Sequence, residues 1–346
     1  MINTFKLFVV IFLLVPALVM AQKPAEYLPE KPGKWFYSNN ITSTEAEYVV
    51  YKKNMATLAE WFHQNIPMLT NPKGFDLTST TYGSWDKYYR MNTCNYGLRT
   101  ELNFNFQLFL SNGGKWTIEP PHYSFDINNT ESGHPTNINV AYFDESKDNP
   151  ALEKAINTAA LKINRIFPVF EFKKQITQGV DLYREAADAY PHHVVVYDPD
   201  RPSYWLPVTV KEMADLYLEY YSLYQKLEID QLLLQELKNE IANIPPEELN
   251  SQAYMGHETN LVFRINGKED GLIGTEKGFP LRKFNPDYWD RSRPTSDIQF
   301  MTFYYPQMTI GQMEESYKNN GHPFYSQLLV NQFDWSKIAG LIRKGK

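Results

Sequence analysis

The chain has 346 residues, of which 40 are acidic and 34 basic, so its formal net charge is −6. A mildly acidic chain lacks the basic footprint of a nucleic-acid-binding protein and of a protein that binds anionic membranes. Its length is typical of about two domains of ~150 residues, or of one large one, and is sufficient to bury a core without disulfide staples.

The N-terminus has the features of a secretory signal peptide. Lys6 precedes an apolar segment at residues 7–20, and the small residue Ala21 follows. This segment is shorter than the roughly 20 residues that a membrane-spanning helix needs. We therefore expect residues 1–21 to be removed, leaving an exported protein, periplasmic or secreted, that begins near Gln22 and keeps no membrane span. Residues 22–42 are rich in Pro, Lys and Asn and predict an extended lead-in.

Residues 43–148 predict a helix followed by an antiparallel meander. Thr44 and Glu47 have capping-box spacing. Apolar residues then recur at helical steps until Pro67, at Tyr48, Tyr51, Met55, Leu58, Phe62 and Ile66. Residues 98–110 instead alternate between apolar and polar side chains, as in a half-buried strand, and the turn at residues 112–114 predicts a hairpin. Residues 123–128 and 137–143 add two more alternating segments.

Residues 149–346 predict a second helix-plus-sheet sub-domain. Asn149 and Pro150 form a helix start, and Pro168 ends that helix. Strand candidates follow at residues 193–197, 261–265 and 298–305, and two short helices are expected within residues 310–342. The predicted fold class is therefore α+β, with amphipathic helices packed on antiparallel sheets in two sub-domains.

One long helix is predicted near residues 209–243. Thr209 and Glu212 form another capping box, and Pro245 and Pro246 end the helix. Such a helix would be roughly 50 Å long, with Asp230 as the one polar interruption of its apolar seam. Tyrosines widen that seam, which favours packing on a sheet of the same chain over a coiled-coil dimer. An oligomer formed through this helix stays as the less favoured alternative.

Motifs for metal, nucleotide or nucleophilic chemistry are incomplete. Cys94 is the only cysteine, so the chain can form no internal disulfide. His257-Glu258 lacks the second histidine of a zinc-protease motif, and Glu60 and His63 form a single, isolated Glu-x-x-His motif. Glycine-rich phosphate loops and the nucleophile elbow are absent from the sequence. We therefore expect no metal and no cofactor.

Two loops that share the pattern Pro-x-Tyr-Trp carry the candidate binding residues. Binding groups concentrate in loops, and sugars stack on aromatic rings beside carboxylates. The candidates are Asp198, Asp200, Arg201, Tyr204, Trp205, Asp287, Tyr288, Trp289 and Asp290. For Trp205 we favour a structural role, in which its ring packs against the first turn of the helix that Thr209 begins. A role at a binding rim is the alternative.

The two segments at residues 198–221 and 284–294 resemble secreted proteins of Bacteroidota bacteria that carry no assigned activity. The resemblance lies mainly in the second half of the chain, and it implies export but no catalytic residue. The expected function is that of a non-catalytic binding or interaction protein of the cell envelope, with a glycan or peptide as ligand. A carboxylate-based hydrolase, such as a glycosidase, and a structural or assembly factor that uses the long helix are the alternatives.

Overall fold

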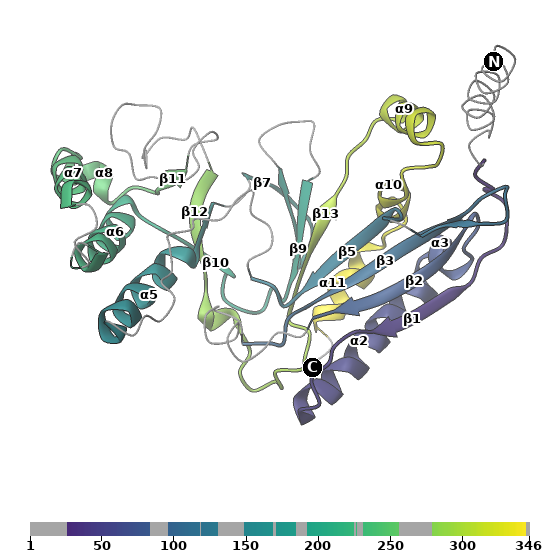
Figure 1. Ribbon diagram of the computed structural model, residues 1–346, viewed down its shortest axis with the longest axis horizontal. Coiled ribbons are helices and arrows are strands. Elements are labelled where there is room, and N and C mark those ends of the chain that lie inside the picture. The colour runs from purple at the N-terminus through teal and green to yellow at the C-terminus, as the bar shows by residue number, and fades with distance from the viewer. Residues whose placement is uncertain are drawn as a thin grey trace, which may run out of the picture.

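The computed structural model describes residues 26–83, 96–117, 119–130, 149–168, 171–184, 192–224, 226, 231–255 and 279–343. The predicted signal peptide, Cys94, His257 and the strand candidates at residues 137–143 and 261–265 lie outside these residues. The described part combines helices with two β-sheets, which confirms the predicted α+β class (Figure 1).

The larger sheet has nine strands in the described part of the chain, in the order β1-β2-β3-β5-β13-β9-β8-β7, with β4 paired to β3. Only β1 and β2 are parallel; the other neighbours are antiparallel. The strands are β1 (Trp35–Asn39), β2 (Phe75–Tyr82), β3 (Thr100–Phe109), β4 (Lys115–Trp116), β5 (His122–Ile127), β7 (Glu171–Thr177), β8 (Val180–Arg184), β9 (His192–Tyr197) and β13 (Phe300–Tyr305). The predicted boundary after residue 148 thus lies between strands that share one sheet, and β1 falls inside the predicted lead-in.

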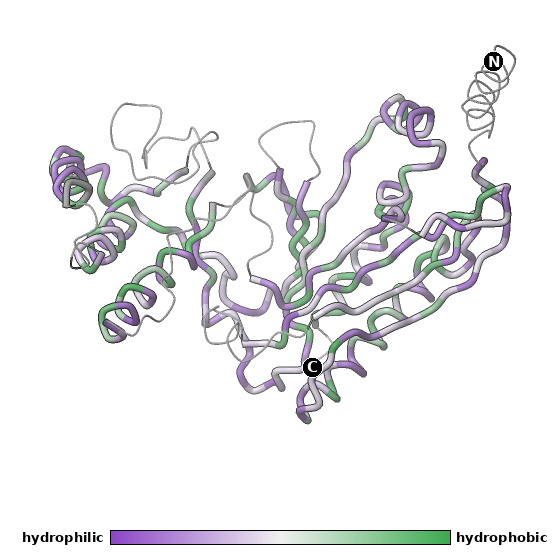
Figure 2. Tube along the Cα trace, in the orientation of Figure 1, coloured by the Kyte–Doolittle hydropathy of each residue, from purple (hydrophilic) through white to green (hydrophobic). Residues whose placement is uncertain are grey.

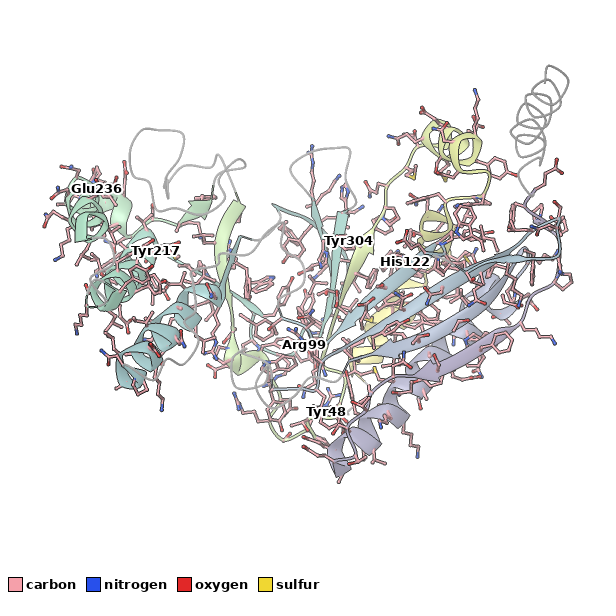
Figure 3. All side chains as sticks on the ribbon, in the orientation of Figure 1. Tyr48, Arg99, His122, Tyr217, Glu236 and Tyr304 are labelled. Atoms are coloured by element: carbon pink, nitrogen blue, oxygen red, sulfur yellow. The ribbon has the colours of Figure 1, made fainter. Side chains whose placement is uncertain are left out.

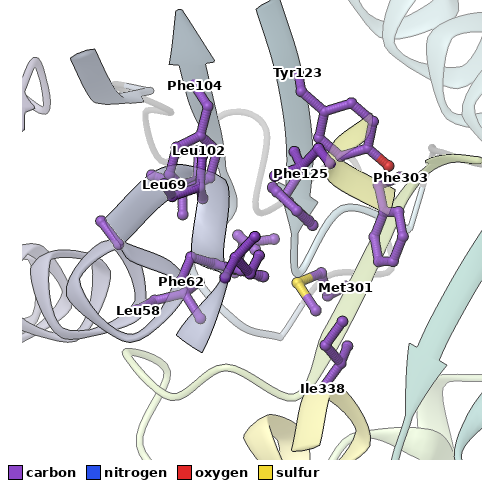
Figure 4. Close-up of a cluster of buried hydrophobic side chains, with 14 of the residues drawn as sticks. Leu58, Phe62, Leu69, Leu102, Phe104, Tyr123, Phe125, Met301, Phe303 and Ile338 are labelled. Atoms are coloured by element: carbon purple, nitrogen blue, oxygen red, sulfur yellow. The ribbon is translucent and has the colours of Figure 1, made fainter. Parts of the chain in front are cut away.

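Helices cover one face of this sheet. They are α2 (Ala46–Asn65), α3 (Pro67–Thr70), α10 (Tyr325–Val330) and α11 (Trp335–Arg343). The period-two pattern of β3 points Leu102, Phe104 and Phe106 into a core that also holds Met55 and Phe62 from α2. Figure 4 shows Leu102, Phe104 and Phe62 in this core. Burying one such side chain stabilises the fold by about 1.5–3 kcal/mol. The polar residues of the same alternation therefore lie on the opposite face of the sheet. Figure 2, coloured by hydropathy, shows hydrophilic and hydrophobic residues interspersed along the strands.

A second group of elements lies apart from the large sheet, at the left of Figure 1. It contains α5 (Pro150–Asn164), α6 (Val210–Tyr224), α7 (Gln231–Ala242) and α8 (Pro246–Leu249). A small antiparallel sheet supports them, formed by β6 (Ile166–Pro168), β10 (Trp205–Pro207), β11 (Tyr254–Met255) and β12 (Phe279–Phe284). The short helix η2 (Pro286–Tyr288) follows β12, and α9 (Ile310–Asn320) follows β13.

The prediction of one continuous helix over residues 209–243 is wrong. The structure has two helices, α6 and α7, which contact each other. Leu237 of α7 packs in the same buried cluster as Met213, Tyr217 and Tyr220 of α6. A straight rod would carry residues 231–242 away from these side chains and leave its apolar stripe in water. Folding back buries Leu237 in this cluster, with Ile241 packed against it.

The two predicted capping boxes have different outcomes. Thr209 is a true N-cap, because its hydroxyl accepts a hydrogen bond from the backbone N–H of Glu212 at 3.1 Å. The capping box at Thr44 is wrong: α2 begins after Glu45, with no side-chain capping bond. Glu47 instead accepts a bond from the hydroxyl of Thr295 at 2.7 Å. The carboxylate that the local pattern assigned to the helix start thus bonds to a residue that is distant in the sequence.

Asn128 joins β5 to β13. Its side-chain oxygen accepts bonds from the backbone N–H groups of Gln299 (2.9 Å) and Phe300 (3.2 Å). Its amide nitrogen donates to the carbonyls of Leu98 and Asp297. Its φ of 53° is a left-handed value that asparagine tolerates better than most residues. One buried side chain thus fixes the register at which the C-terminal strand enters the sheet.

Candidate functional site

The aromatic residues nominated from the sequence are buried. The exposed fraction is 4% for Tyr204, 8% for Trp205, 1% for Tyr288 and 2% for Trp289. All four belong to one cluster that also includes Phe300 of the large sheet. The shared Pro-x-Tyr-Trp pattern therefore marks two loops that pack together at the junction between the sheets. Trp205 is buried, as a structural role requires, but its ring packs against Phe167 and Phe284 in this cluster. The first turn of α6 belongs to a different cluster, so the packing that the sequence favoured for this ring is not the one found.

Arg201 fastens the two loops to each other. Its guanidinium donates to the backbone carbonyls of Tyr288 (2.8 Å), Trp289 (2.8 Å) and Asp287 (3.1 Å). The hydroxyl of Tyr288 accepts a bond from the backbone N–H of Asp198 and donates one to the carbonyl of Gln299. Backbone carbonyl oxygens thus occupy the planar guanidinium, and its hydrogen bonds hold the two loops together.

The nominated carboxylates hold their own turns. Asp198 accepts a bond from the backbone N–H of Asp200 at 3.0 Å. Asp290 accepts bonds from the hydroxyl and the backbone N–H of Ser292, and these bonds lower the pKa of its carboxyl group. Asp287 and Asp200 are exposed. The fold brings the two loops together, but the contacts of Asp198 and Asp290 are those of turn residues.

A buried carboxylate lies beside this joint. Asp181 of β8 accepts bonds from the hydroxyls of Tyr204 (2.8 Å) and Tyr197 (3.2 Å). The hydroxyl of Tyr204 also lies 2.5 Å from that of Tyr183. Burial raises the pKa of Asp181, and the hydrogen bonds from the tyrosines oppose that rise. This network ties the large sheet to the loop that enters β10.

A better candidate for ligand binding is the face of the large sheet that the described helices leave uncovered. We call it the polar face and define it by Tyr82, Glu101, Asn103, Ser124, Asp126, Thr302 and Tyr304. These residues come from β2, β3, β5 and β13, and register pairs Tyr82 with Glu101, Glu101 with Asp126, Asn103 with Ser124 and Asp126 with Thr302. Alternation along β13 places Tyr304 on the same face as Thr302. In Figure 3 the labelled Tyr304 lies on the sheet above Arg99, which precedes β3.

Glu101 is held in a fixed orientation on the polar face. One carboxylate oxygen, Oε1, accepts bonds from the hydroxyl of Ser124 (2.6 Å) and the amide of Asn103 (3.2 Å). The same amide also donates to the Ser124 hydroxyl at 3.0 Å. Within the described residues, the second oxygen Oε2 has no protein partner. It can accept a hydrogen bond from a ligand without breaking the bonds that orient the carboxylate.

Two more acceptors on the polar face lack partners among the described residues. They are the side-chain oxygens of Asn103 and Thr302, both in buried positions. A buried polar atom without a partner costs about 1–3 kcal/mol. Such a cost calls for an explanation other than stability, and a donor from bound water or ligand would relieve it.

Exposed aromatic rings flank these polar groups. Tyr82, on one side of the polar groups, is 42% exposed, and Tyr304, on the other side, is 54% exposed. The ring of Tyr304 also meets the ring of His193 edge to face, with centroids 5.5 Å apart. Rings that keep this much surface in water can stack on a ligand, as the buried rings at the joint between the loops cannot.

Sequence reasoning missed the polar face. Glu101, Asn103 and Asn105 appear in the sequence as the solvated side of an alternating strand. The available signal was their chemistry, since amides and a carboxylate occupy positions where lysine or threonine would serve a merely solvated strand. Their partners Ser124 and Thr302 come from strands that no local pattern places beside β3.

Comparisons with known proteins found no family model, no curated protein and no solved structure that matches the chain. The resemblance to exported Bacteroidota proteins thus stays an expectation from the sequence. Within the described ranges, no helix is both long and apolar enough to cross a membrane. The same part of the chain contains no group of three or more His, Cys, Asp or Glu side chains that could hold a metal ion.

Proposed function

We propose that the protein is an exported, non-catalytic binding protein of the cell envelope, and that its polar face binds a glycan. The observation that carries this proposal is the oriented Glu101 carboxylate, which lies between the exposed rings of Tyr82 and Tyr304 and has one oxygen without a partner among the described residues. Sugar hydroxyls are donors that suit carboxylate and amide oxygens, and the apolar face of a sugar ring suits an aromatic side chain.

The dimensions of the polar face favour a chain of several sugar rings over a single one. Tyr82 and Thr302 lie on strands separated by three strand spacings, which is about 14 Å at ~4.8 Å per spacing. The groups on offer are side chains in the middle of a sheet. A peptide that added a strand would need the backbone groups of a sheet edge instead, so a glycan suits this face better than a peptide.

A glycan array followed by titration calorimetry tests this proposal. We expect at least one oligosaccharide to bind, and Glu101→Ala to weaken that binding at least tenfold. Tyr82→Ala and Tyr304→Ala should each weaken it several-fold, because each removes one stacking ring. Gln235→Ala, on the exposed side of the distant α7, is the control. The proposal fails if no glycan binds, or if Glu101→Ala and the control bind equally well.

A glycosidase is the second candidate, because one specific pair of carboxylates favours it. Glu101 and Asp126 are register partners on β3 and β5, and side chains at such positions have Cβ atoms about 4.5–5.5 Å apart. Retaining glycosidases use two carboxyl groups roughly 5 Å apart. The pair differs from the loop carboxylates that the sequence suggested. Release of new reducing ends from a bound oligosaccharide, abolished by Glu101→Gln, would establish hydrolysis; an intact oligosaccharide after long incubation would reject it.

Export is a separate part of the proposal, and it rests on the charge, apolar segment and small residue at the start of the sequence. Mass spectrometry of the protein from the envelope or medium of the cells that make it should find an N-terminus near Gln22. A soluble protein that still begins with Met1 would contradict export.

A further inference from the structure

A cavity of about 320 Å³ lies on the helix-covered side of the large sheet. Asn54, Thr57 and Trp61 of α2 form one wall, and their spacing places them on one face of that helix. Arg293 and Asp297, in the loop before β13, and Leu341 of α11 also line it. This volume is at the small end of the range for ligand sites, about 300–1,000 Å³.

The charges in this cavity compensate each other. The guanidinium of Arg293 donates to the carboxylate of Asp297 at 3.0 Å. Its other nitrogens donate to the backbone carbonyls of Ile342 and Ile298, each at 3.2 Å. All three nitrogens of Arg293 therefore have protein partners, and a charged ligand would find no uncompensated charge of opposite sign. The lining favours an uncharged ligand.

Three polar atoms of the lining residues make no protein hydrogen bond within the described part of the chain. They are the Oδ1 oxygen of Asp297, the Oδ1 oxygen of Asn54 and the indole Nε1 of Trp61. Asp297 uses its other oxygen for Arg293, and Asn54 uses its amide nitrogen for the carbonyl of Ser296. The residues that line the cavity thus include two acceptors and one donor without a described protein partner, together with an aromatic ring and the apolar Leu341.

We propose that this cavity is a second binding site, separate from the polar face, and that it takes a single uncharged sugar ring. The ring's C–H face packs against Trp61, and its hydroxyls donate to the free oxygens of Asn54 and Asp297. The site lies on the opposite side of the sheet from Glu101. It can therefore be tested whether or not the polar face binds a glycan.

The test uses three probes of similar size: methyl β-D-glucopyranoside, which is uncharged, glucosamine, which is cationic, and glucuronate, which is anionic. Nuclear magnetic resonance follows the indole N–H signal of Trp61, assigned with Trp61→Phe. We expect the uncharged probe to shift this signal in a saturable way, and both charged probes to bind at least tenfold more weakly. No saturable shift with the uncharged probe, or tighter binding of a charged one, would overturn the proposal.

The chain offers a matched pair of variants. Thr57 and Thr158 are both exposed helical threonines whose hydroxyls donate to the carbonyl of a lysine four residues earlier, but only Thr57 lines the cavity. Thr57→Trp should fill the cavity and weaken binding of the uncharged probe at least tenfold, whereas Thr158→Trp should leave it unchanged. Equal binding by the two variants rules the site out. Glu101→Ala should keep full binding here, so failure of the polar face and failure of this cavity are distinguishable.

Discussion

Replacing Arg201 measures how strongly the two aromatic loops are held together. Arg201→Ala removes charge-assisted bonds to the carbonyls of Tyr288, Trp289 and Asp287. Each such bond is worth about 1.5–3 kcal/mol when it is protected from water. The bond to Asp287 is exposed and counts for little, and the other two are only part-buried. We therefore expect a loss of about 3 kcal/mol in the free energy of unfolding, toward the low end for two bonds.

Urea unfolding, followed by circular dichroism, provides the measurement. Arg201→Lys should recover little of the loss, because an ammonium group cannot present the planar fork that reaches adjacent carbonyls. Arg291→Ala is the control: this exposed side chain lies over the ring of Tyr96, and its removal should cost under about 0.5 kcal/mol. If Arg201→Ala costs no more than this control, the guanidinium does not hold the loops and the nominated loop residues return as candidates for ligand binding.

Variants at three further positions test neighbouring parts of the structure by the same urea assay. Trp205→Ala deletes a buried ring and should cost roughly 3–5 kcal/mol; a cost under about 0.5 kcal/mol would contradict its burial. Thr209→Ala removes the bond to the N–H of Glu212 and should cost about 1 kcal/mol, and Thr209→Ser much less; equal costs would mean that the hydroxyl is not the cap. Because burial raises the folded-state pKa of Asp181 above its usual 3.8, the folded protein holds this proton more tightly than the unfolded chain. Stability should thus fall as pH rises from about 3.8 through the folded pKa, and Asp181→Asn should remove that decline; an unchanged decline in the variant would reject the assignment.

Local sequence patterns predicted the individual helices and strands of this fold better than they predicted which of these elements lie side by side. Helical spacing from Tyr48 to Phe62 and alternation from Leu102 to Leu108 correspond to α2 and β3. These signals report which face of an element is apolar, and nothing about which element lies beside it. The position of β13 between β5 and β9 depends on contacts between residues more than a hundred positions apart. The contiguous halves suggested by the sequence have no counterpart in the order of the strands.

The polar face could not be predicted from the sequence for the same reason. The bond between Glu101 and Ser124 spans 23 residues, and Thr302 reaches the same face from the end of the chain. The loop residues, in contrast, stood out because tryptophan and tyrosine beside proline attract notice wherever they occur. In this chain Tyr204, Trp205, Tyr288 and Trp289 are buried at the junction between the sheets, which agrees with the general rule that aromatic residues more often fill cores than bind ligands.

Because β13 comes late in the sequence, the large sheet can be completed only near the end of synthesis. Residues 26–130 contribute β1 to β5, so β5 has an unpaired edge until residues 300–305 have been made. An open strand edge is a template for pairing with other chains, and contacts this distant in sequence form slowly. Until then, the side-chain oxygen of Asn128 at that edge lacks its donors, the N–H groups of Gln299 and Phe300. A chain that is interrupted before residue 299 therefore lacks the strand that closes its sheet, and aggregation is the fate to expect for such a fragment.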